Sequence, residues 1–243
     1  MSLRKILPIL LFTVLIFGDG LVQEPLKGSF NLNINNNGIS LFPNFSLGKP
    51  AAIVNASVGK ANFYFEPEMR WGLNAKPWSY IYWLRYKHKS SEHFGLNLGV
   101  QISYVFAEKE VGINGVLKNR YLATRYAAFE VAPTYYKSKK FAFGIYYLNS
   151  FGLDSNGIQS GQFVSIQPKF LNIKVSNDYF LGFYPQLFHL ILDDKKGTYF
   201  SESLSFNKKN LPVSLTSLFT YKLNSSIAGD NIVWNVGINF HFD

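Results

Sequence analysis

The strict alternation of apolar and polar residues at the end of this chain is the feature that most constrains its fold. Residues 232–242 place apolar side chains at every second position, which puts them on one face of an extended strand. The segment matches the roughly 9–11 residues that a tilted strand needs to cross a bilayer, whereas strands of soluble sheets average about 5–6 residues. Lipid on one face and water on the other explains both the length and the alternation. The apolar set is Ile232, Trp234, Val236, Ile238, Phe240 and Phe242, and the intervening set is Val233, Asn235, Gly237, Asn239 and His241.

The same pattern recurs along the chain and predicts an all-β fold. An open sheet cannot lie in lipid, because the backbone groups at its edges would stay unsatisfied, so the strands must close on themselves. We therefore expect a closed antiparallel transmembrane β-barrel of about 12 strands. The expected strands are 28–35, 39–47, 61–73, 78–88, 94–106, 120–136, 140–150, 161–174, 178–192, 197–206, 211–223 and 232–242.

Two features fit this strand map poorly. Connections on the periplasmic side of a bacterial barrel are short. The connection 48–60 should be on that side but is long, which would be explained if a pair of strands were miscounted, so 10 or 14 strands remain alternatives. Prolines also fall inside expected strands, where they cannot donate to the backbone ladder, and we expect bulges or register shifts there. These prolines are Pro43, Pro67, Pro133, Pro168, Pro185 and Pro212.

The first twenty residues have the layout of a secretory signal peptide. Arg4 and Lys5 precede an apolar stretch at 6–17, and Gly18 and Gly20 place small residues where a signal peptidase cuts. The apolar stretch is shorter than the roughly 20 residues of a membrane-spanning helix, although an uncleaved N-terminal anchor is the alternative. We predict a signal peptide at 1–20, cleaved after Gly20, and one barrel domain at 21–243. The chain has no cysteine, which excludes disulfides and a lipid-anchored lipoprotein.

Composition favours a membrane barrel over a nucleic-acid-binding protein. Aromatic residues reach 17%, charged residues only 16%, and the mean hydropathy is +0.01, as alternating apolar and polar residues would produce. The net charge is +9, but many lysines fall in predicted turns, where anionic lipid headgroups are the simpler partner. We expect outer-membrane lipids as partners and no nucleic acid.

Together these features resemble the bacterial outer-membrane β-barrel superfamily, whose last strand commonly ends on an aromatic residue. Here Phe240 and Phe242 supply that ending, and Asp243 departs from it by one residue. The resemblance implies insertion by the barrel-insertion machinery into the bacterial outer membrane, with both termini periplasmic. The long connections predicted at 107–119, 151–160 and 224–231 follow odd-numbered strands, as external loops do in that orientation.

Charged and amide side chains on the inward set are the candidate functional residues. If they pair across a narrow interior, they fill it, and the barrel is a plugged structural or adhesion-type protein that acts through external loops. If some of them line water, they set the field across a small pore. We predict a narrow pore or uptake channel for small polar or charged solutes, with the plugged barrel as the alternative. The predicted lumen-lining residues are Glu66, Glu68, Arg70, Arg85, Lys87, Gln101 and Glu130, with Tyr126, Tyr184, Gln186 and, on a less certain face, Lys169 adding polar surface.

A lipid hydrolase is a less favoured alternative. If a hairpin pairs Leu192 with Gly197, His189 and Glu202 become diagonal neighbours on the outward face, as a base and its orienting group would be. No serine of matching parity lies on the neighbouring strand, so we assign no catalytic residue. The remaining histidines show no ligand spacing, and we expect neither a metal nor a cofactor.

Overall fold

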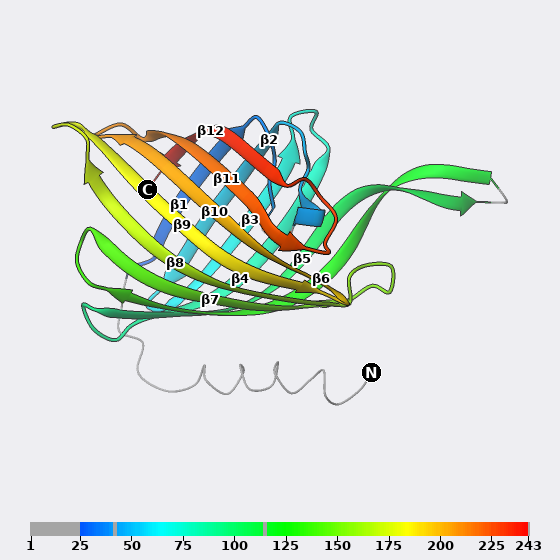
Figure 1. Ribbon diagram of the computed structural model, residues 1–243, viewed down its shortest axis with the longest axis horizontal. Helices are drawn as coiled ribbons and strands as arrows, with labels where there is room; N and C mark the ends of the chain where they lie inside the picture. The colour runs from blue at the N-terminus through cyan, green and yellow to red at the C-terminus, as the bar shows by residue number, and fades with distance from the viewer. Residues whose placement is uncertain (1–24, 41–42, 114–115, 243) are drawn as a thin grey trace.

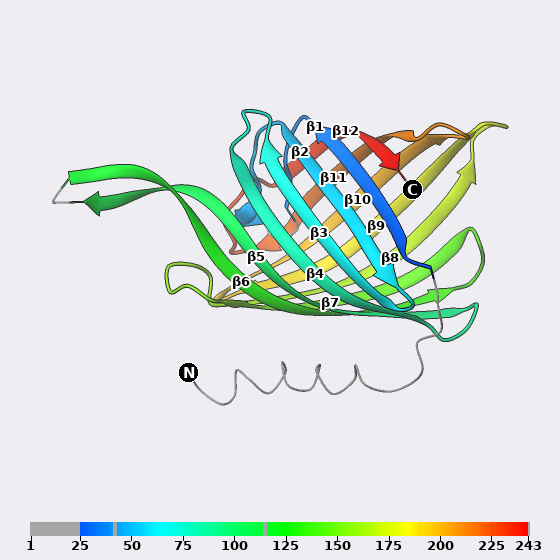
Figure 2. The same cartoon turned by 180° about the vertical axis from the view of Figure 1, so that it is seen from behind.

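The computed structural model describes residues 25–40, 43–113 and 116–242, which form a closed antiparallel barrel of twelve strands (Figures 1 and 2). Each strand pairs with its neighbours in sequence, and β1 pairs with β12 to complete the ring, as Phe30 opposite Phe242 illustrates. The predicted fold class and strand number are confirmed. The predicted signal peptide at 1–20 lies outside the described residues. Within the described ranges, no helix is long and apolar enough to cross a membrane.

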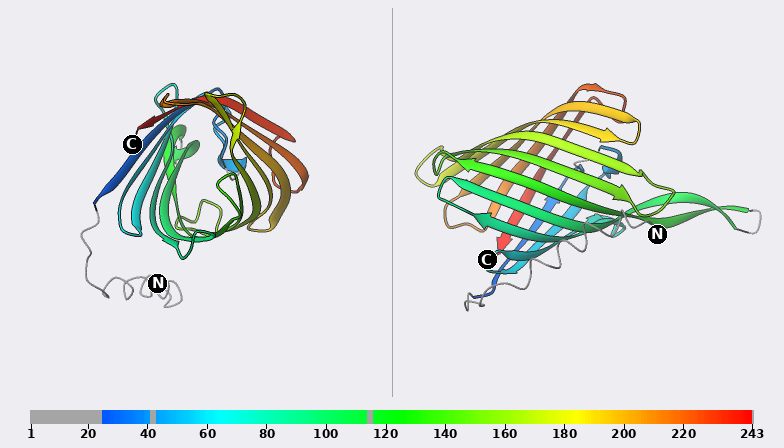
Figure 3. Two further views of the ribbon diagram at one scale, coloured as in Figure 1. Left: turned by 90° about the vertical axis from the view of Figure 1, so that its left-hand side faces the viewer. Right: turned by 90° about the horizontal axis from the view of Figure 1, so that it is seen from below.

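The strands are long and tilted, and consecutive strands are joined at alternating ends of the barrel (Figure 3). The end at which β1 begins and β12 ends has short turns, such as 61–62 between β2 and β3. The opposite end carries the longer connections, among them 36–50 and 153–159. The elements are β1 (Lys27–Asn35), η2 (Pro43–Phe45), β2 (Ala51–Lys60), β3 (Phe63–Gly72), β4 (Pro77–Lys89), β5 (Phe94–Ile113), β6 (Val116–Tyr136), β7 (Phe141–Gly152), β8 (Ser160–Lys174), β9 (Tyr179–Leu192), β10 (Lys195–Lys208), β11 (Val213–Ser225) and β12 (Ile232–Phe242).

The second strand is not where the sequence placed it. The prediction of a strand at 39–47 is wrong, because this segment belongs to the connection 36–50 and includes the short 3₁₀ turn η2. The strand is instead β2, inside the stretch 48–60 that seemed too long for a turn. Its outward residues are mostly small, which weakens the alternation that reveals a strand. The long connection now follows β1, an odd-numbered strand, so the anomaly in connection lengths disappears.

The predicted loop at 107–119 is also wrong, since β5 and β6 continue through most of it as a paired hairpin. Pairing runs on to Ile113 opposite Val116, whereas β4 stops pairing with β5 at Val105 and β7 stops pairing with β6 at Tyr126. The two strands therefore leave the wall as a two-stranded ribbon, drawn in green in Figure 1.

Prolines inside strands interrupt the pairing without changing its register. Around Pro67, the flanking pairs Asn55–Glu68 and Val58–Phe65 belong to the same register, so the expected register shift there is wrong. The pairs that flank Pro133 and Pro168 keep register in the same way. By alternation Pro67, Pro133, Pro168 and Pro185 belong to the outward set of their strands. Pro43 lies in η2 and Pro212 precedes β11, and the shifts that do occur lie at Arg70/Trp71, Phe170/Ile173 and Thr198/Tyr199.

Large apolar side chains cover the outer face of the barrel. On β12, Trp234 is 54% exposed and Val236 50%, and Leu84 on β4 is 50% exposed. A soluble protein rarely exposes an apolar belt of this extent, whereas a barrel surrounded by acyl chains requires one. The polar set therefore faces inward and defines the lumen.

Candidate functional site: the barrel lumen

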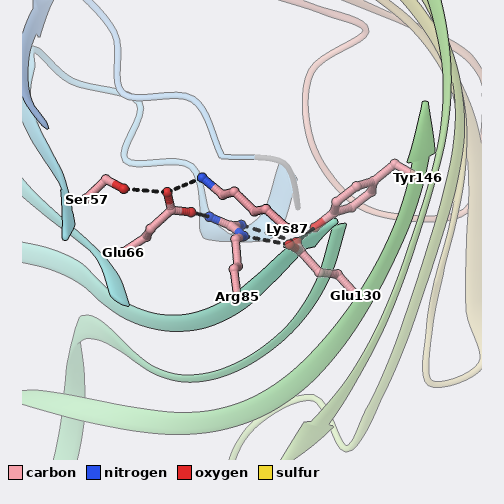
Figure 4. Close-up of polar contacts among 6 residues, drawn as sticks. All are labelled: Ser57, Glu66, Arg85, Lys87, Glu130 and Tyr146. Carbon is pink, nitrogen blue, oxygen red and sulfur yellow. Dashed lines mark hydrogen bonds and ion pairs between the residues drawn. The ribbon is translucent and has the colours of Figure 1, made fainter. Parts of the chain in front are cut away.

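A cluster of charged side chains from β3, β4 and β6 occupies one inner wall of the barrel (Figure 4). Arg85 lies at its centre and donates from Nη1 to Glu66 Oε2 at 2.8 Å and from Nε to Glu130 Oε1 at 2.6 Å. The Tyr146 hydroxyl of β7 donates to the other oxygen of Glu130 at 2.7 Å. Glu130 is 3% exposed, and its charge is compensated by these contacts.

The second carboxylate of the cluster, Glu66, is shared between two strands as well. Lys87 of β4 donates to Glu66 Oε1, and the Ser57 hydroxyl of β2 donates to the same oxygen at 2.8 Å. Alternation along β4 puts Arg85 and Lys87 on the same face, so both cations reach the carboxylate from one strand. The cluster is a continuous polar network from β2 to β7.

One glycine of β5 allows the cluster to cross that strand. Gly99 pairs with Arg85 on one side and with Glu130 on the other. A Cβ at Gly99 would lie 2.9 Å from Glu130 Cγ, so any side chain there would displace the carboxylate. The guanidinium of Arg85 instead lies 4.2 Å from the ring centroid of Trp83 and spans the glycine to reach Glu130.

The remaining predicted lumen residues, Glu68, Arg70 and Gln101, are outside this hydrogen-bonded cluster. Glu68 and Arg70 form an ion pair with each other along β3, and the Arg70 guanidinium lies 5.0 Å from the ring of Trp78. The side-chain oxygen of Gln101 on β5 is buried and has no hydrogen-bond partner among the described residues. Four predicted residues, Glu66, Arg85, Lys87 and Glu130, thus belong to one hydrogen-bonded cluster. Glu68 pairs with Arg70 instead and lines the small cavity beside the cluster.

A small polar cavity lies beside the charged cluster. It has a volume of about 260 Å³ and is bounded by Glu66, Arg85 and Lys87 on one side and by Asn31 and Asn55 on the other. Carboxylate, guanidinium, ammonium and amide groups therefore all face the same space, which can hold several water molecules. Charges of both signs in such a space can bind polar solutes or order water.

A larger cavity lies against β8–β11, with the connection 36–50 as its other wall. Its volume is about 460 Å³, and its strand wall carries two cations, Lys169 and Lys222, together with neutral polar side chains. The structure therefore resolves the face of Lys169, which alternation left uncertain. Sequence analysis missed most of this wall, because serine and threonine on an inner face look like those of any polar surface. The polar residues lining it from the strands are Gln167, Lys169, Tyr184, Gln186, Ser201, Ser203, Thr220 and Lys222.

The connection 36–50 folds into the ring of strands, as the blue helical turn in the left view of Figure 3 shows. The indole Nε1 of Trp78 on β4 donates to the Phe45 carbonyl oxygen at 2.6 Å. The Phe45 ring lies 5.2 Å from the ring of Tyr126 on β6. The connection is therefore held against the β4–β6 wall and narrows the lumen from that side.

An apolar cluster narrows the lumen further, near the end opposite the termini. Phe163 of β8 and Leu190 of β9 are fully buried there, and Ile227 of the β11–β12 connection packs with them. The lumen is thus apolar and tight toward this end and polar below it. We call this buried apolar cluster the constriction.

A hydrogen-bonded series joins β1, β12 and β11 where the barrel closes. The His241 ring lies 2.9 Å from Ser214 Oγ through Nε2 and 2.6 Å from Asn31 Oδ1 through Nδ1. The order resembles a serine–histidine–asparagine arrangement, but Ser214 is only 2% exposed and a substrate could not reach it. The series therefore ties the closing strands together.

The arrangement considered for a lipid hydrolase does not form. The β9–β10 hairpin pairs Leu192 with Lys195, two residues from the expected register, and His189 contacts Thr198 at 2.8 Å. Glu202 lies opposite Pro185, away from His189. The prediction that His189 and Glu202 are neighbours is wrong, because a two-residue turn replaced the longer one assumed. Among the described residues, no three histidine, aspartate or glutamate side chains gather as a metal site.

A closed, even-stranded barrel with an apolar exterior and a polar lumen is the fold of bacterial outer-membrane β-barrels. The solved structures similar to this chain are of that class. The KdgM porin in complex with disordered oligogalacturonate has a TM-score of 0.59 at 11% identity, covering 88% of this chain and 99% of that chain. The NanC porin has a TM-score of 0.54 at 12% identity, covering 87% and 98%. An outer membrane channel from Pseudomonas putida F1 has a TM-score of 0.52 at 9% identity, covering 92% and 98%.

No family model and no curated protein sequence matches the chain. At identities of 9–12% the likeness concerns the fold, which this chain shares with the solved barrels over nearly their whole length. The architecture is therefore that of a bacterial outer-membrane barrel.

Proposed function

We propose that this protein is a narrow outer-membrane channel for small polar or charged solutes. The observation that carries the proposal is the pair of cavities inside the barrel, a smaller one of about 260 Å³ beside the paired charges and a larger one of about 460 Å³ lined by hydroxyl, amide, cationic and apolar groups. A barrel with a purely structural role does not need solvent-accessible cavities lined by ionised groups, because apolar side chains that fill the interior stabilise the folded barrel at least as well.

Barrel size and orientation support the same function. Twelve strands lie between eight-stranded barrels, which side chains fill, and porins of about 16 strands, which are open. The solved barrels that resemble this chain include porins and a channel. We further propose that both termini are periplasmic, which makes the connection 36–50 and the β5–β6 hairpin external. A solute would then meet the constriction before the charged cluster.

Single-channel conductance of the mature chain, residues 21–243, tests the proposal. The refolded barrel should migrate differently on a gel before and after heating, and should then give steady conductance steps in a planar bilayer. Arg70→Gln changes the charge of the lumen, and Lys137→Gln changes the charge of an exposed turn. We expect the ion selectivity of Arg70→Gln to differ from that of the wild type. The ion selectivity of Lys137→Gln should be unchanged. A correctly folded barrel that conducts no ions would overturn the channel.

The projecting β5–β6 hairpin favours a second candidate, a barrel that binds an external partner. Its two strands extend together beyond Val105 and Tyr126, so both outer edges carry backbone groups without a neighbouring strand in the barrel. Such edges accept additional strands. Replacing residues 107–122 with a two-residue turn should leave conductance intact and abolish adhesion of cells that display the protein. Unchanged adhesion would contradict this role.

A further inference from the structure

Lys169 of β8 is a half-buried cation inside the barrel, and it forms no ion pair with any residue of the described ranges. Its ammonium lies above Gly144 of β7: a Cβ at Gly144 would stand 3.4 Å from Lys169 Nζ and equally far from Thr134 Oγ1. The other inward cations of the cluster, Arg85 and Lys87, have carboxylate partners. A secluded charge without a counter-ion is unfavourable. Lys222 of β11 lines the same cavity and donates to the Gly229 carbonyl oxygen, so among the described residues this wall carries two cations and no paired carboxylate.

Hydroxyl groups continue the row that begins at Lys169. By the register that pairs Phe170 with Phe183, Lys169 stands opposite Tyr184 of β9. Tyr184 in turn pairs with Ser203 of β10. Lys169, Tyr184 and Ser203 thus occupy adjacent positions on three strands, and all three line the larger cavity. Their polar groups are at different levels, because the Tyr184 hydroxyl lies over Gly182 and the Lys169 ammonium over Gly144.

The next row of the same wall supplies amide donors. Gln167 Nε2 donates to Gln186 Oε1 at 2.9 Å, which orients the Gln186 side chain so that its own NH₂ is left to donate. No described residue accepts a hydrogen bond from that NH₂. Gln167 pairs with Gly144 of β7, so the two amides and Gly144 are at the same level along the barrel. The Lys169 ammonium lies over Gly144 and therefore reaches this level too.

The third row is aromatic. Phe188 of β9 and Tyr199 of β10 are stacked with ring centroids 4.9 Å apart and 13° between their planes. Both line the same cavity as Lys169 and Gln186. Rows of one face are two residues apart along a strand, or about 7 Å, so the cation and the stacked rings are separated by roughly the length of one small ring compound.

We propose that the larger cavity binds a small organic anion with one carboxylate and a flat apolar ring. The carboxylate would accept from Lys169 and Gln186, and the ring would point toward the apolar end of the cavity, which the buried side chains of Phe188 and Tyr199 close. This inference rests on the proposed channel function, for which it names the solute class. A volume of about 460 Å³ is in the range of small-ligand pockets, and the acidic residue among its lining residues, Asp230, lies in the β11–β12 connection and not on the strand wall.

Calorimetric titration of the folded barrel in detergent micelles tests the site with benzoate as the probe and benzamide as its neutral counterpart of the same shape. The wild type should bind benzoate and not benzamide, after subtraction of a titration into empty micelles. Lys169→Gln should raise the benzoate Kd about tenfold or more, since it removes a charged hydrogen bond. Lys169→Arg should keep most of the affinity. Lys137→Gln, in an exposed turn, should change nothing.

Equal benzoate affinity in the wild type and in folded Lys169→Gln would overturn the inference. Equal affinity for benzoate and benzamide would overturn it as well, because the charge would then play no part. The titration requires no ion flow, so the two proposals fail separately. If the barrel binds benzoate but never conducts ions, the channel proposal is contradicted and the binding site is supported. If the barrel conducts ions but does not bind benzoate, the binding site is contradicted and the channel proposal is supported.

Discussion

Arg85 of β4 reaches across β5 and binds both oxygens of Glu130 on β6, with nitrogen–oxygen distances of 2.6 and 3.2 Å. The contact joins strands that are not neighbours, and it lies on the inner wall next to the smaller cavity. The Arg85–Glu130 contact therefore has two roles. It links β4 to β6 across β5, and it leaves part of the Arg85 side chain facing the smaller cavity.

Breaking this pair from one side should destabilise the barrel strongly. Glu130→Gln leaves the half-buried guanidinium of Arg85 with one carboxylate instead of two, and losing a partner from a buried pair costs about 3–5 kcal/mol. Urea unfolding of the barrel in micelles measures the change in the free energy of unfolding. The exposed pair Lys76–Glu108 is the control, and Glu108→Gln should cost less than about 1 kcal/mol. Equal losses in the two variants would contradict the argument.

Gly99 is expected to tolerate no side chain. In Gly99→Ala the new Cβ would stand 2.9 Å from Glu130 Cγ, so the carboxylate must move and its contact with Arg85 must lengthen. Overpacking of this kind costs about 1–3 kcal/mol. The matched control is Gly28→Ala on β1, where the nearest atom to the new Cβ is 3.7 Å away. If both variants unfold at the same urea concentration as the wild type, Gly99 does not make the space for the pair.

Trp78 should control how far the connection 36–50 narrows the lumen. Trp78→Phe keeps an aromatic ring but removes the hydrogen bond from Nε1 to the Phe45 carbonyl oxygen. We expect a larger single-channel conductance and more frequent transitions between levels, because the connection loses its anchor to β4. Trp234→Phe, on the outer face of β12, is the control and should conduct like the wild type. Identical conductance in all three proteins would show that the connection does not limit ion flow.

The connection 153–159 should loosen in acid. Asp154 accepts hydrogen bonds from the Arg125 side chain and from its backbone N–H, which lowers the pKa of Asp154 below its ordinary value of 3.8. A carboxylate with a lowered pKa stabilises the fold above its ordinary pKa, and that contribution disappears as the pH falls through the lowered value.

Amide hydrogen exchange in 153–159 measures this effect. Protection should be constant from pH 7 to about pH 5 and should fall below about pH 4. In Asp154→Asn the protection should already be low at pH 7 and should show no step with pH. A step of the same size in that variant would assign the titration to another group.

Alternation along single strands made the architecture predictable. On β12 and β5 the apolar set repeats at every second position over a membrane-spanning length, and one face of such a strand must meet lipid. The same reasoning put Glu66, Arg85, Lys87 and Glu130 on the inner face. It failed for β2, whose small outward residues give a weak pattern, and for the hairpin beyond Val105, where pairing between two polar strands continues without lipid.

The sequence by itself determined that the chain closes into a barrel of about twelve strands and which charged side chains point inward, because both follow from a period of two within each strand. Partners depend on the register between strands and on where connections fold, and no single strand contains that information. Only the tertiary structure decided that Arg85 crosses Gly99 to Glu130, that 36–50 enters the lumen, and that Lys169 has no carboxylate partner within the described ranges. Those three relationships decide which charged groups of the lumen are paired and which face its cavities unpaired.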